Sequence, residues 1–313
     1  MHSASQRAFA LVGPGRAGTT IATALVARGL RCVAVAGRSP EAPSTVAVAA
    51  RLGAPAVAVA EVGHVDGLGG DGGLGGNDGL GGNDGLGGDG GLDTELVIIA
   101  TPDAEIAGTA AALVPAVAPG TLVIHLSGAC TLAELDKLAA ARPDVLVGSL
   151  HPLQSLPSVE LGVERLPGSW CAVDGPAGVE RLAVSLGMRP FRVADEQRVA
   201  YHAAATIASN HLVALLGQAS RIAAEAGVPP EALLPLVRAT LDNVETLGPE
   251  AALTGPVARG DADTVARHLD TLPAAELRAY RALAAEALRL TGRDDAALAA
   301  VLQDGPAHED GAA

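Results

Sequence analysis

Residues 8–18, AFALVGPGRAG, constrain the fold of this chain more than any other stretch. A short apolar run leads into three closely spaced glycines, Gly13, Gly15 and Gly18, and an Ala- and Leu-rich helical pattern follows over residues 19–28. A strand, a glycine turn and a helix in this order are typical of a dinucleotide-binding unit. The alternative is a glycine-rich turn in some other α/β domain.

Each glycine has its own expected role in such a unit. Gly13 permits the tight turn, Gly15 lets a pyrophosphate approach the backbone, and Gly18 lets the helix pack close to the strand. Arg16 and Ala17 lie in the same turn. The N-terminus of the helix offers free N–H groups and a partial positive charge to phosphates.

The composition narrows the classes of function. The 313 residues are enough for two domains of about 100–200 residues each. The net charge of -14 and the aromatic share of 2% argue against nucleic-acid binding, which needs clustered cations and stacking platforms. The three cysteines, Cys32, Cys130 and Cys171, are far apart and lack zinc spacing, so we expect reduced thiols and no metal site.

The chain lacks the signs of export and of membrane insertion. No basic N-terminal segment precedes a long apolar stretch, and the first apolar run is the first expected strand. We find no apolar run near the roughly 18 residues needed to span a bilayer. These features predict a cytoplasmic protein without membrane contact.

The end of the second expected strand indicates which dinucleotide binds. Residues 31–36, RCVAVA, are typical of a buried parallel strand, and Gly37, Arg38 and Ser39 follow. An NAD-specific domain usually carries an acidic residue at this position to hold the ribose 2′-hydroxyl. Arg38 and Ser39 instead suit a 2′-phosphate. We therefore predict NADP(H) as the cofactor, the alternative being that Arg38 is an exposed loop arginine.

Strand and helix patterns alternate through the N-terminal part of the chain. Strands are expected at residues 8–12, 31–36, 56–60, 95–100, 121–126, 145–150, 170–174 and 189–193. This alternation predicts an open, mostly parallel sheet. Ligands of such sheets bind outside the carboxyl ends of the strands, where Thr101, Ser127 and His151 are expected.

One segment interrupts the alternation. Residues 66–93 form an imperfect repeat rich in Gly and Asp, with a period of about six residues and no β-branched side chain. Such a segment buries too little apolar surface to offset the entropy of ordering it, so we expect a flexible insertion. Calcium binding is the alternative function for an Asp- and Gly-rich repeat.

From residue 195 onward the pattern is purely helical. Helices are expected over residues 195–226, 231–247, 263–272 and 274–290. The predicted fold class is α/β followed by all-α, with a Rossmann NADP-binding domain over 1–193, a helical domain over 194–303 and a disordered tail over 304–313.

Several motifs together resemble a known group. The glycine turn is followed by TPD at 101–103, HLSG at 125–128, HPLQS at 151–155 and a long helix that carries YHAAATIASNHLVAL from residue 201 onward. This order is similar to that of Rossmann-like oxidoreductases whose C-terminal domain is of unknown function. They are distant relatives of ketopantoate reductase, pyrroline-5-carboxylate reductase and the 6-phosphogluconate dehydrogenase superfamily. The segment ALTGPVARGD at 252–261 is also typical of that group.

The resemblance implies NADP(H)-dependent reduction of a small keto or imino compound. Ketopantoate is one candidate substrate, and analogy with relatives predicts a homodimer formed through the helical domain. The alternatives are a protein that binds NADP(H) as a sensor or scaffold without chemistry, and an α/β protein that binds no dinucleotide.

The better-known relatives place a lysine on the first long C-terminal helix, and this chain departs from that pattern. Lys137 is its only lysine and lies in the first domain. His202, Thr206 and Asn210 instead follow each other at four-residue spacing, which puts them on one helix face. His202 could donate a proton to the substrate, or only bind it, and Asn210 could orient it.

The candidate residues fall into two groups. The candidate catalytic residues are His202, Asn210, His151 and Ser127. The candidate cofactor-binding residues are Gly13, Gly15, Arg16, Ala17, Gly18, Arg38, Ser39, Thr101, Pro102, Ser127 and Gly128. For the histidines the alternative is a structural hydrogen bond, and for Ser127 it is a helix cap.

Overall fold

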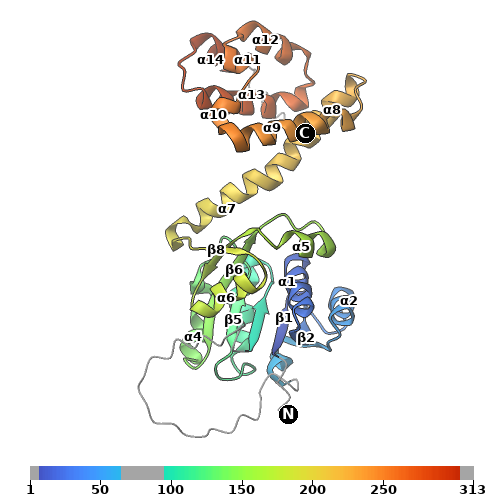
Figure 1. Cartoon of the computed structure of the whole chain (residues 1–313), viewed down its shortest axis with the longest axis vertical. Helices are drawn as coiled ribbons and strands as arrows, with labels where there is room; N and C mark the ends of the chain where they lie inside the picture. Colours follow the sequence, from blue (N-terminus) through green and yellow to red (C-terminus); the bar gives the residue numbers. More distant parts are fainter. Residues whose placement is uncertain (1–6, 65–94, 304–313) are drawn as a thin grey trace, which may run out of the picture. The chain divides into compact units, whose positions relative to one another are not determined.

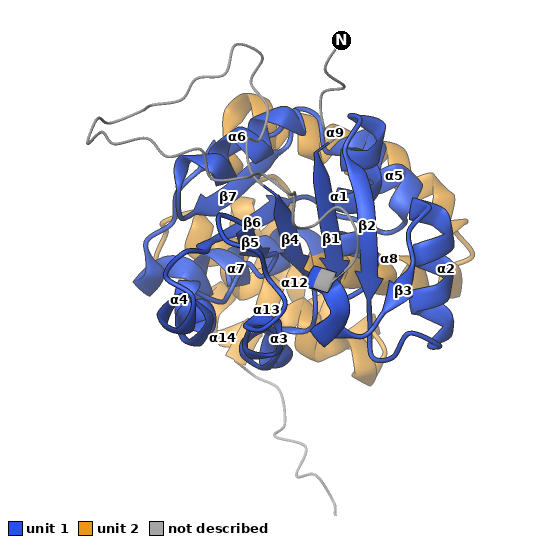
Figure 2. Cartoon of the chain, turned by 90° about the horizontal axis from the view of Figure 1, so that it is seen from below, with its two compact units in different colours: residues 1–209 blue, residues 210–313 orange. Residues whose placement is uncertain are grey.

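The structure, a computed structural model, describes residues 7–64 and 95–303. The predicted flexible insertion at 66–93, with its calcium alternative, and the predicted disordered tail at 304–313 lie outside the described residues. The chain divides into two compact units, Met1–Ser209 and Asn210–Ala313, which Figure 2 distinguishes by colour.

The first unit is built on one eight-stranded sheet (Figure 1). Its strands are β1 (Ala8–Val12), β2 (Arg31–Ala36), β3 (Ala56–Val57), β4 (Leu96–Ile99), β5 (Leu122–His125), β6 (Leu146–Leu153), β7 (Trp170–Asp174) and β8 (Arg189–Phe191). Their order across the sheet is β3-β2-β1-β4-β5-β6-β7-β8. The pairs from β3 to β6 are parallel, β7 runs antiparallel to β6, and β8 is parallel to β7.

Helices cover both faces of this sheet (Figure 2). One face carries α1 (Arg16–Ala27), α2 (Pro43–Leu52), α5 (Val159–Arg165) and α6 (Ala177–Ser185). The other carries α3 (Ile106–Leu113), α4 (Asp136–Ala141) and the short 3-10 segments Val59–His64 and Leu132–Leu135. The sequence analysis missed α5, which is only seven residues long and lacks a full amphipathic repeat.

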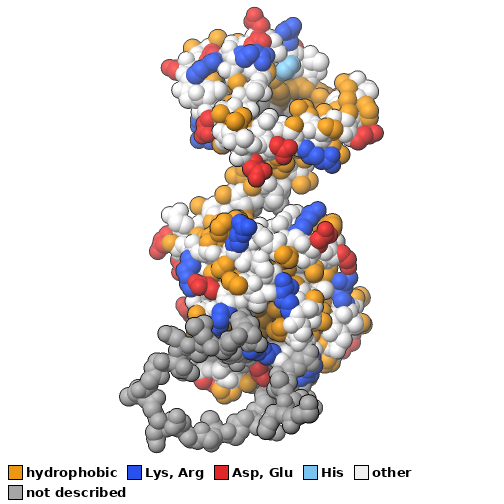
Figure 3. Space-filling model, viewed as in Figure 1, with side chains coloured by type: hydrophobic (Ala, Val, Ile, Leu, Met, Phe, Trp, Pro, Cys, Tyr) orange, Lys and Arg blue, Asp and Glu red, His pale blue; other side chains and the backbone are white. Residues whose placement is uncertain are grey.

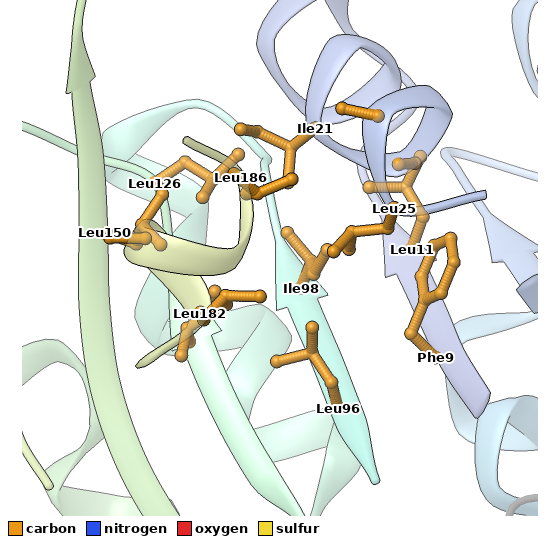
Figure 4. Close-up of a cluster of buried hydrophobic side chains, with 14 of the residues drawn as sticks. Phe9, Leu11, Ile21, Leu25, Leu96, Ile98, Leu126, Leu150, Leu182 and Leu186 are labelled. Atoms are coloured by element: carbon orange, nitrogen blue, oxygen red, sulfur yellow. The ribbon is translucent and has the colours of Figure 1, made fainter. Parts of the chain in front are cut away.

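Two hydrophobic cores follow from the alternation of side chains along each strand. Phe9 and Leu11 of β1 face the core under α1 and α6 (Figure 4), whereas Ala10 and Val12 face the core under α3. All residues of β1 and β4 are buried, which explains why these strands have continuous apolar runs in the sequence.

The strand order confirms the predicted Rossmann fold. The chain moves outward from β1 to β3 and then returns to β4 on the other side of β1, so the order reverses between β1 and β4. Ligands of open α/β sheets bind at such a switch point, outside the carboxyl ends of the strands.

The second unit is helical, as predicted. Its helices are α8 (Leu212–Glu225), α9 (Leu233–Leu247), α10 (Pro249–Ala252), α11 (Pro256–Arg259), α12 (Ala262–Thr271), α13 (Ala274–Leu290) and α14 (Ala296–Gln303). Its buried core consists of Val257, Val265, Leu269, Ala284 and Leu298.

One long helical stretch, Asp195–Glu225, belongs to both units. It contains α7 (Arg198–Thr206), a π-helical turn (Ile207–His211) and α8. The predicted domain boundary after residue 193 lies at the start of this stretch and stays a prediction, whereas the compact units meet after Ser209.

This stretch is also long and apolar enough to cross a membrane, although the sequence analysis found no such run. This holds for its length and composition alone, because few charges interrupt the Ala-, Val- and Leu-rich sequence. A single such helix is weak evidence for a membrane protein. Arg198 and Tyr201, in its first turns, are hydrogen-bonded to groups of the first unit.

Candidate functional site

The turn after β1 needs glycine at two positions for the fold itself. Gly13 has a φ of +93°, and a Cβ there would lie 2.5 Å from the carbonyl carbon of Ala100. Its N–H donates to the carbonyl oxygen of Ala36 at 2.8 Å, which joins the turn to β2. A Cβ on Gly18 would lie 2.6 Å from the Cβ of Ala100, so this glycine sets how closely α1 packs on the sheet.

Gly15 differs from its neighbours because nothing in the fold requires it. Its φ of -81° and ψ of 178° suit any residue. A Cβ there would meet only the carbonyl oxygen of Ala100, at 4.0 Å, among the described residues. The residue is exposed, so the space outside this turn is open to a ligand.

The first turn of α1 has the properties of an anion-binding site. The helix begins at Arg16 without a side-chain cap and without an acidic residue in its first turn. Its first N–H groups therefore face outward beside the positive end of the helix dipole. The free N–H groups and the open space at Gly15 together fit a phosphate group of a dinucleotide.

Arg38 and Ser39 follow β2 at the same edge of the sheet. Arg38 is exposed and has no hydrogen-bond or ion-pair partner within residues 7–64 and 95–303. A Cβ on Gly37 would overlap the hydroxyl of Thr45, so glycine at this position lets the first turn of α2 lie directly beside the strand end. The guanidinium of Arg38 is thus free to bind an anion next to α2.

The loop after β4 lies beside the glycine turn, and the loop after β5 follows the next strand of the sheet. Thr101 follows β4, and its buried Oγ1 has no hydrogen-bond partner in the described part of the chain. Ser127 follows β5, and its Oγ accepts hydrogen bonds from the N–H groups of Ala129 (3.2 Å) and Cys130 (3.0 Å). Ser127 therefore shapes its loop, which agrees with the capping role considered from the sequence.

His151 lies at the centre of a cluster of polar side chains at this edge. The ring packs against the backbone of Gly128, where a Cβ would lie 2.7 Å from its Cε1 and 2.8 Å from its Nε2. The Nδ1 atom lies 2.7 Å from the hydroxyl of Tyr201. The ring centroid of His202 lies 5.9 Å from that of His151 in an edge-on arrangement.

A buried arginine lies beneath this cluster. The side chain of Arg198 is 1% exposed. Its Nη1 donates to the carbonyl oxygen of Cys130 at 2.9 Å, and its Nη2 donates to the Oγ of Ser149 at 2.8 Å. The nearest carboxylate oxygens, of Asp174 and Asp195, both lie 3.7 Å away. Arg198 thus ties the start of α7 to the loop after β5 and to β6.

Burial and this guanidinium hold two histidines neutral. Burial lowers the pKa of His151 to about 4, assisted by the charges of His202 and Arg198. Burial also lowers the pKa of His125 to about 4, and Arg198 is the next cause. The Nδ1 of His125 accepts a hydrogen bond from the N–H of Ser127 at 3.2 Å. Neither ring carries a charge at neutral pH.

The structure brings His151, His202, Ser127 and Gly128 together within the first unit. Asn210 is the first residue of the second unit and lies in the π-helical turn, so its role stays a prediction. Sequence reasoning missed Tyr201 and Arg198. Tyr201 directly precedes His202 and could have been noticed as a second polar group on that helix.

Comparison with known proteins agrees with this architecture. Residues 174–287 match the family model described as "Domain of unknown function (DUF2520)". No curated protein sequence matches the chain. This match agrees with the predicted C-terminal domain of unknown function.

Three solved structures share the fold over most of the chain. A protein from Bacteroides fragilis, described as a candidate NADP oxidoreductase, is 22% identical, with 92% of this chain and 100% of that chain covered and a TM-score of 0.69. A protein from Thermotoga maritima is 22% identical, with 91% and 100% covered and a TM-score of 0.59. A reductive aminase from Aspergillus terreus, solved with NADPH4, cyclohexanone and allyl amine, is 16% identical, with 94% and 99% covered and a TM-score of 0.56. At these identities the likeness shows a common fold.

Proposed function

We propose that this protein is an NADP(H)-dependent oxidoreductase that reduces a small keto or imino compound. The observation that carries the proposal is the turn at Gly15, which the fold leaves open and which the N-terminus of α1 makes favourable for a pyrophosphate. The histidine cluster around His151 lies at the same edge of the same sheet, where a reacting group of a bound dinucleotide is expected.

The proposed cofactor is NADP(H) rather than NAD(H). Arg38 is exposed and unpaired within the described residues, and Ser39 follows it at the end of β2. A guanidinium and a hydroxyl at this position suit a 2′-phosphate, whereas a ribose hydroxyl is usually held by a carboxylate. The Bacteroides fragilis and Aspergillus terreus proteins, whose descriptions mention NADP and NADPH4, support this choice.

The proposed roles of the site residues follow from their positions. When bound, NADPH would supply the hydride for the substrate carbon. His151 and His202 are the candidate proton donors, since the ring of His151 lies against Gly128 and the ring of His202 lies beside it. Thr101 and Pro102 would line the nicotinamide pocket, and Asn210 would orient the substrate. A keto acid such as ketopantoate is the substrate to try first.

The decisive experiment is NADPH oxidation followed at 340 nm with a panel of small keto acids and cyclic imines. Turnover of one member with a saturable rate supports an oxidoreductase. Tight NADPH binding without turnover of any member would favour the alternative function, a sensor or scaffold that binds the dinucleotide without chemistry.

We further propose that two copies associate through the helical unit. The apolar side chains of α8 and α9 are largely exposed in a single chain (Figure 3). The exposed members are Val213, Leu215, Leu234, Leu236, Leu241, Val244 and Leu247. A monomer rarely exposes so many large apolar side chains on neighbouring helices. Analytical ultracentrifugation tests this, with Leu236→Glu expected to shift a dimer to a monomer.

A further inference from the structure

We propose that Tyr201 and His151 form a proton relay, in which the Tyr201 hydroxyl donates to Nδ1 of His151 and the Nε2–H of His151 donates to the substrate. This deepens the proposed function and rests on it. Tyr201 was absent from the sequence-based candidates, and the relay assigns it a role in the reaction.

The geometry of the pair supports a fixed hydrogen bond. The Tyr201 hydroxyl lies 2.7 Å from Nδ1 of His151, and the two rings meet edge-on with centroids 5.6 Å apart. Gly128 on one side and the ring of His202 on another restrict how the imidazole can turn. The ring of Phe191 packs edge-on against Tyr201, with centroids 5.7 Å apart. Both partners are therefore held in place before any substrate arrives.

Acidity decides the direction of this hydrogen bond. Burial raises the pKa of Tyr201 to about 12 and lowers that of His151 to about 4, so both side chains are neutral at pH 7. A phenol is a better donor than a neutral imidazole N–H, and an imidazole nitrogen is a better acceptor than a phenol oxygen. The O–H of Tyr201 therefore donates to Nδ1, and the ring proton of His151 lies on Nε2.

The Nε2 atom of His151 is available to a substrate. It has no hydrogen-bond partner within residues 7–64 and 95–303, yet it is not among the enclosed polar atoms of that part of the chain. In this it differs from the Nε2 atom of His125, which is enclosed and unpartnered. A carbonyl oxygen or imine nitrogen that approaches Nε2 would meet a neutral N–H donor.

The relay moves two protons and balances. As the substrate carbon receives a hydride, the substrate oxygen or nitrogen takes the proton from Nε2 of His151, and Nδ1 takes the proton from the Tyr201 hydroxyl. The O–H bond of Tyr201 breaks, and the resulting phenolate regains a proton from water. An alkoxide is about as basic as hydroxide, whose conjugate acid has a pKa of about 15.7, so transfer from a group of pKa about 12 is favourable.

The charges around His151 favour this neutral relay over an imidazolium donor. The groups that act on its titration are His202 and Arg198 from α7, Asp103 from the loop after β4 and His125 from β5. The thiol of Cys171, from β7, is kept protonated by burial, which raises its pKa to about 12. Arg198 and the second imidazole both disfavour a positive charge on His151, and only Asp103 opposes them.

The test begins with the tautomer of His151, measured by ¹⁵N NMR of histidine-labelled protein without cofactor. We expect the Nε2–H tautomer from pH 5.5 to 9 in the wild type and a mixture of tautomers in Tyr201→Phe, which keeps the ring packing. The matched control is Tyr280→Phe, because Tyr280 makes the same 2.7 Å contact with Nδ1 of His268 in the second unit. An Nδ1–H tautomer in the wild type would overturn the relay.

The second readout is the rate of NADPH oxidation with the substrate found in the panel. Tyr201→Phe should lower kcat by about 10- to 100-fold with KM within twofold, while Tyr280→Phe leaves kcat unchanged. The kcat of the wild type should not change with pH above pH 6.5, whereas the kcat of an enzyme with an imidazolium donor would fall tenfold per pH unit. The proton inventory of the wild-type reaction should be curved, because two protons move.

The outcomes separate the relay from the proposed function. An unchanged kcat in Tyr201→Phe would refute the relay while leaving a reductase. Tight NADPH binding with no turnover by the wild type would refute the reductase, and the relay with it, even where the tautomer is the expected one.

Discussion

Two neutral histidines, one in the candidate site and one buried beside it, make the stability of the first unit depend on pH. His125 and His151 have a folded pKa of about 4, against about 6.5 in an unfolded chain. Between these values the unfolded chain binds more protons than the folded one, so stability is complete above about pH 6.5 and decreases as the pH falls. Between pH 7 and pH 5 each histidine then lowers the free energy of unfolding by about 2 kcal/mol.

His151 is partly exposed, so solvent screening reduces its contribution to this pH dependence. We expect the free energy of unfolding to fall by about 3 kcal/mol in total between pH 7 and pH 5. The chain's single tryptophan, Trp170, lies on β7 and packs edge-on against Phe191, so its fluorescence reports the unfolding of the first unit. Urea titrations at pH 7, 6 and 5 measure the difference. Carboxylates with lowered pKa values, such as Glu160, protonate below this range and do not interfere.

His125→Gln is the informative variant, since it removes one of the two titrating groups. Its stability should fall by about 1–2 kcal/mol between pH 7 and 5, roughly half of the change in the wild type. Equal stability of the wild type at pH 7 and pH 5 would refute the reasoning, because the buried imidazoles would then bind protons as readily as exposed ones.

Three further predictions concern single residues. Gly128→Ala places a Cβ within 2.9 Å of three ring atoms of His151, so the ring must shift; we expect a loss of about 1–3 kcal/mol in urea unfolding and a displaced His151 signal in NMR. Gly108→Ala, on an exposed turn of α3 with open space at its Cβ, should stabilise by about 0.5–1 kcal/mol, and a comparable loss there would contradict this. Arg38→Ala should weaken NADPH binding about 10- to 100-fold in calorimetry and leave NADH binding unchanged; equal losses for both would place Arg38 away from the 2′-phosphate.

Local pattern was enough to predict the sheet. The runs at Ala8–Val12 and Leu96–Ile99 are buried on both faces, so every residue in them is apolar and the strands stand out in the sequence. Short elements were harder: α5 has seven residues, too few for a period to appear, and the strand predicted at 56–60 is only the two residues of β3, because a 3-10 helix begins at Val59. The strand β7 was predicted at residues 170–174, but its antiparallel direction was not, because an apolar run does not record the direction of a strand.

The glycine turn could be predicted from the sequence, whereas the contacts of Arg198 and Tyr201 could not. The glycine turn is local, so its residues and their spacing are adjacent in the chain. The contacts of Arg198 and Tyr201 join residues about 50 positions apart, His151 with Tyr201 and Ser149 with Arg198, and no spacing predicts such pairs. Even so, the helix after residue 195 and the loop at His151 were both expected to hold site residues.

The three glycines of the turn are needed for different physical reasons, and this difference gives the most direct test of the proposed dinucleotide site. Gly13 and Gly18 are required by close contacts within the fold, whereas Gly15 has ordinary backbone angles and open space around it. Gly15→Asp should therefore fold normally, with an unchanged or slightly higher Tm. Asp is a favourable N-cap, and its negative charge interacts favourably with the positive end of the helix dipole. The Gly15→Ala variant supplies the uncharged control.

Calorimetric titration of NADPH into the wild type, Gly15→Ala and Gly15→Asp is the measurement that decides whether a dinucleotide lies on this turn. A carboxylate about 5 Å from a pyrophosphate charge costs about 3 kcal/mol at an effective dielectric constant of about 20, so Gly15→Asp should bind NADPH at least about 100-fold more weakly than the wild type. Equal affinity of NADPH for the wild type and a folded Gly15→Asp variant would contradict a dinucleotide site at the first glycine turn.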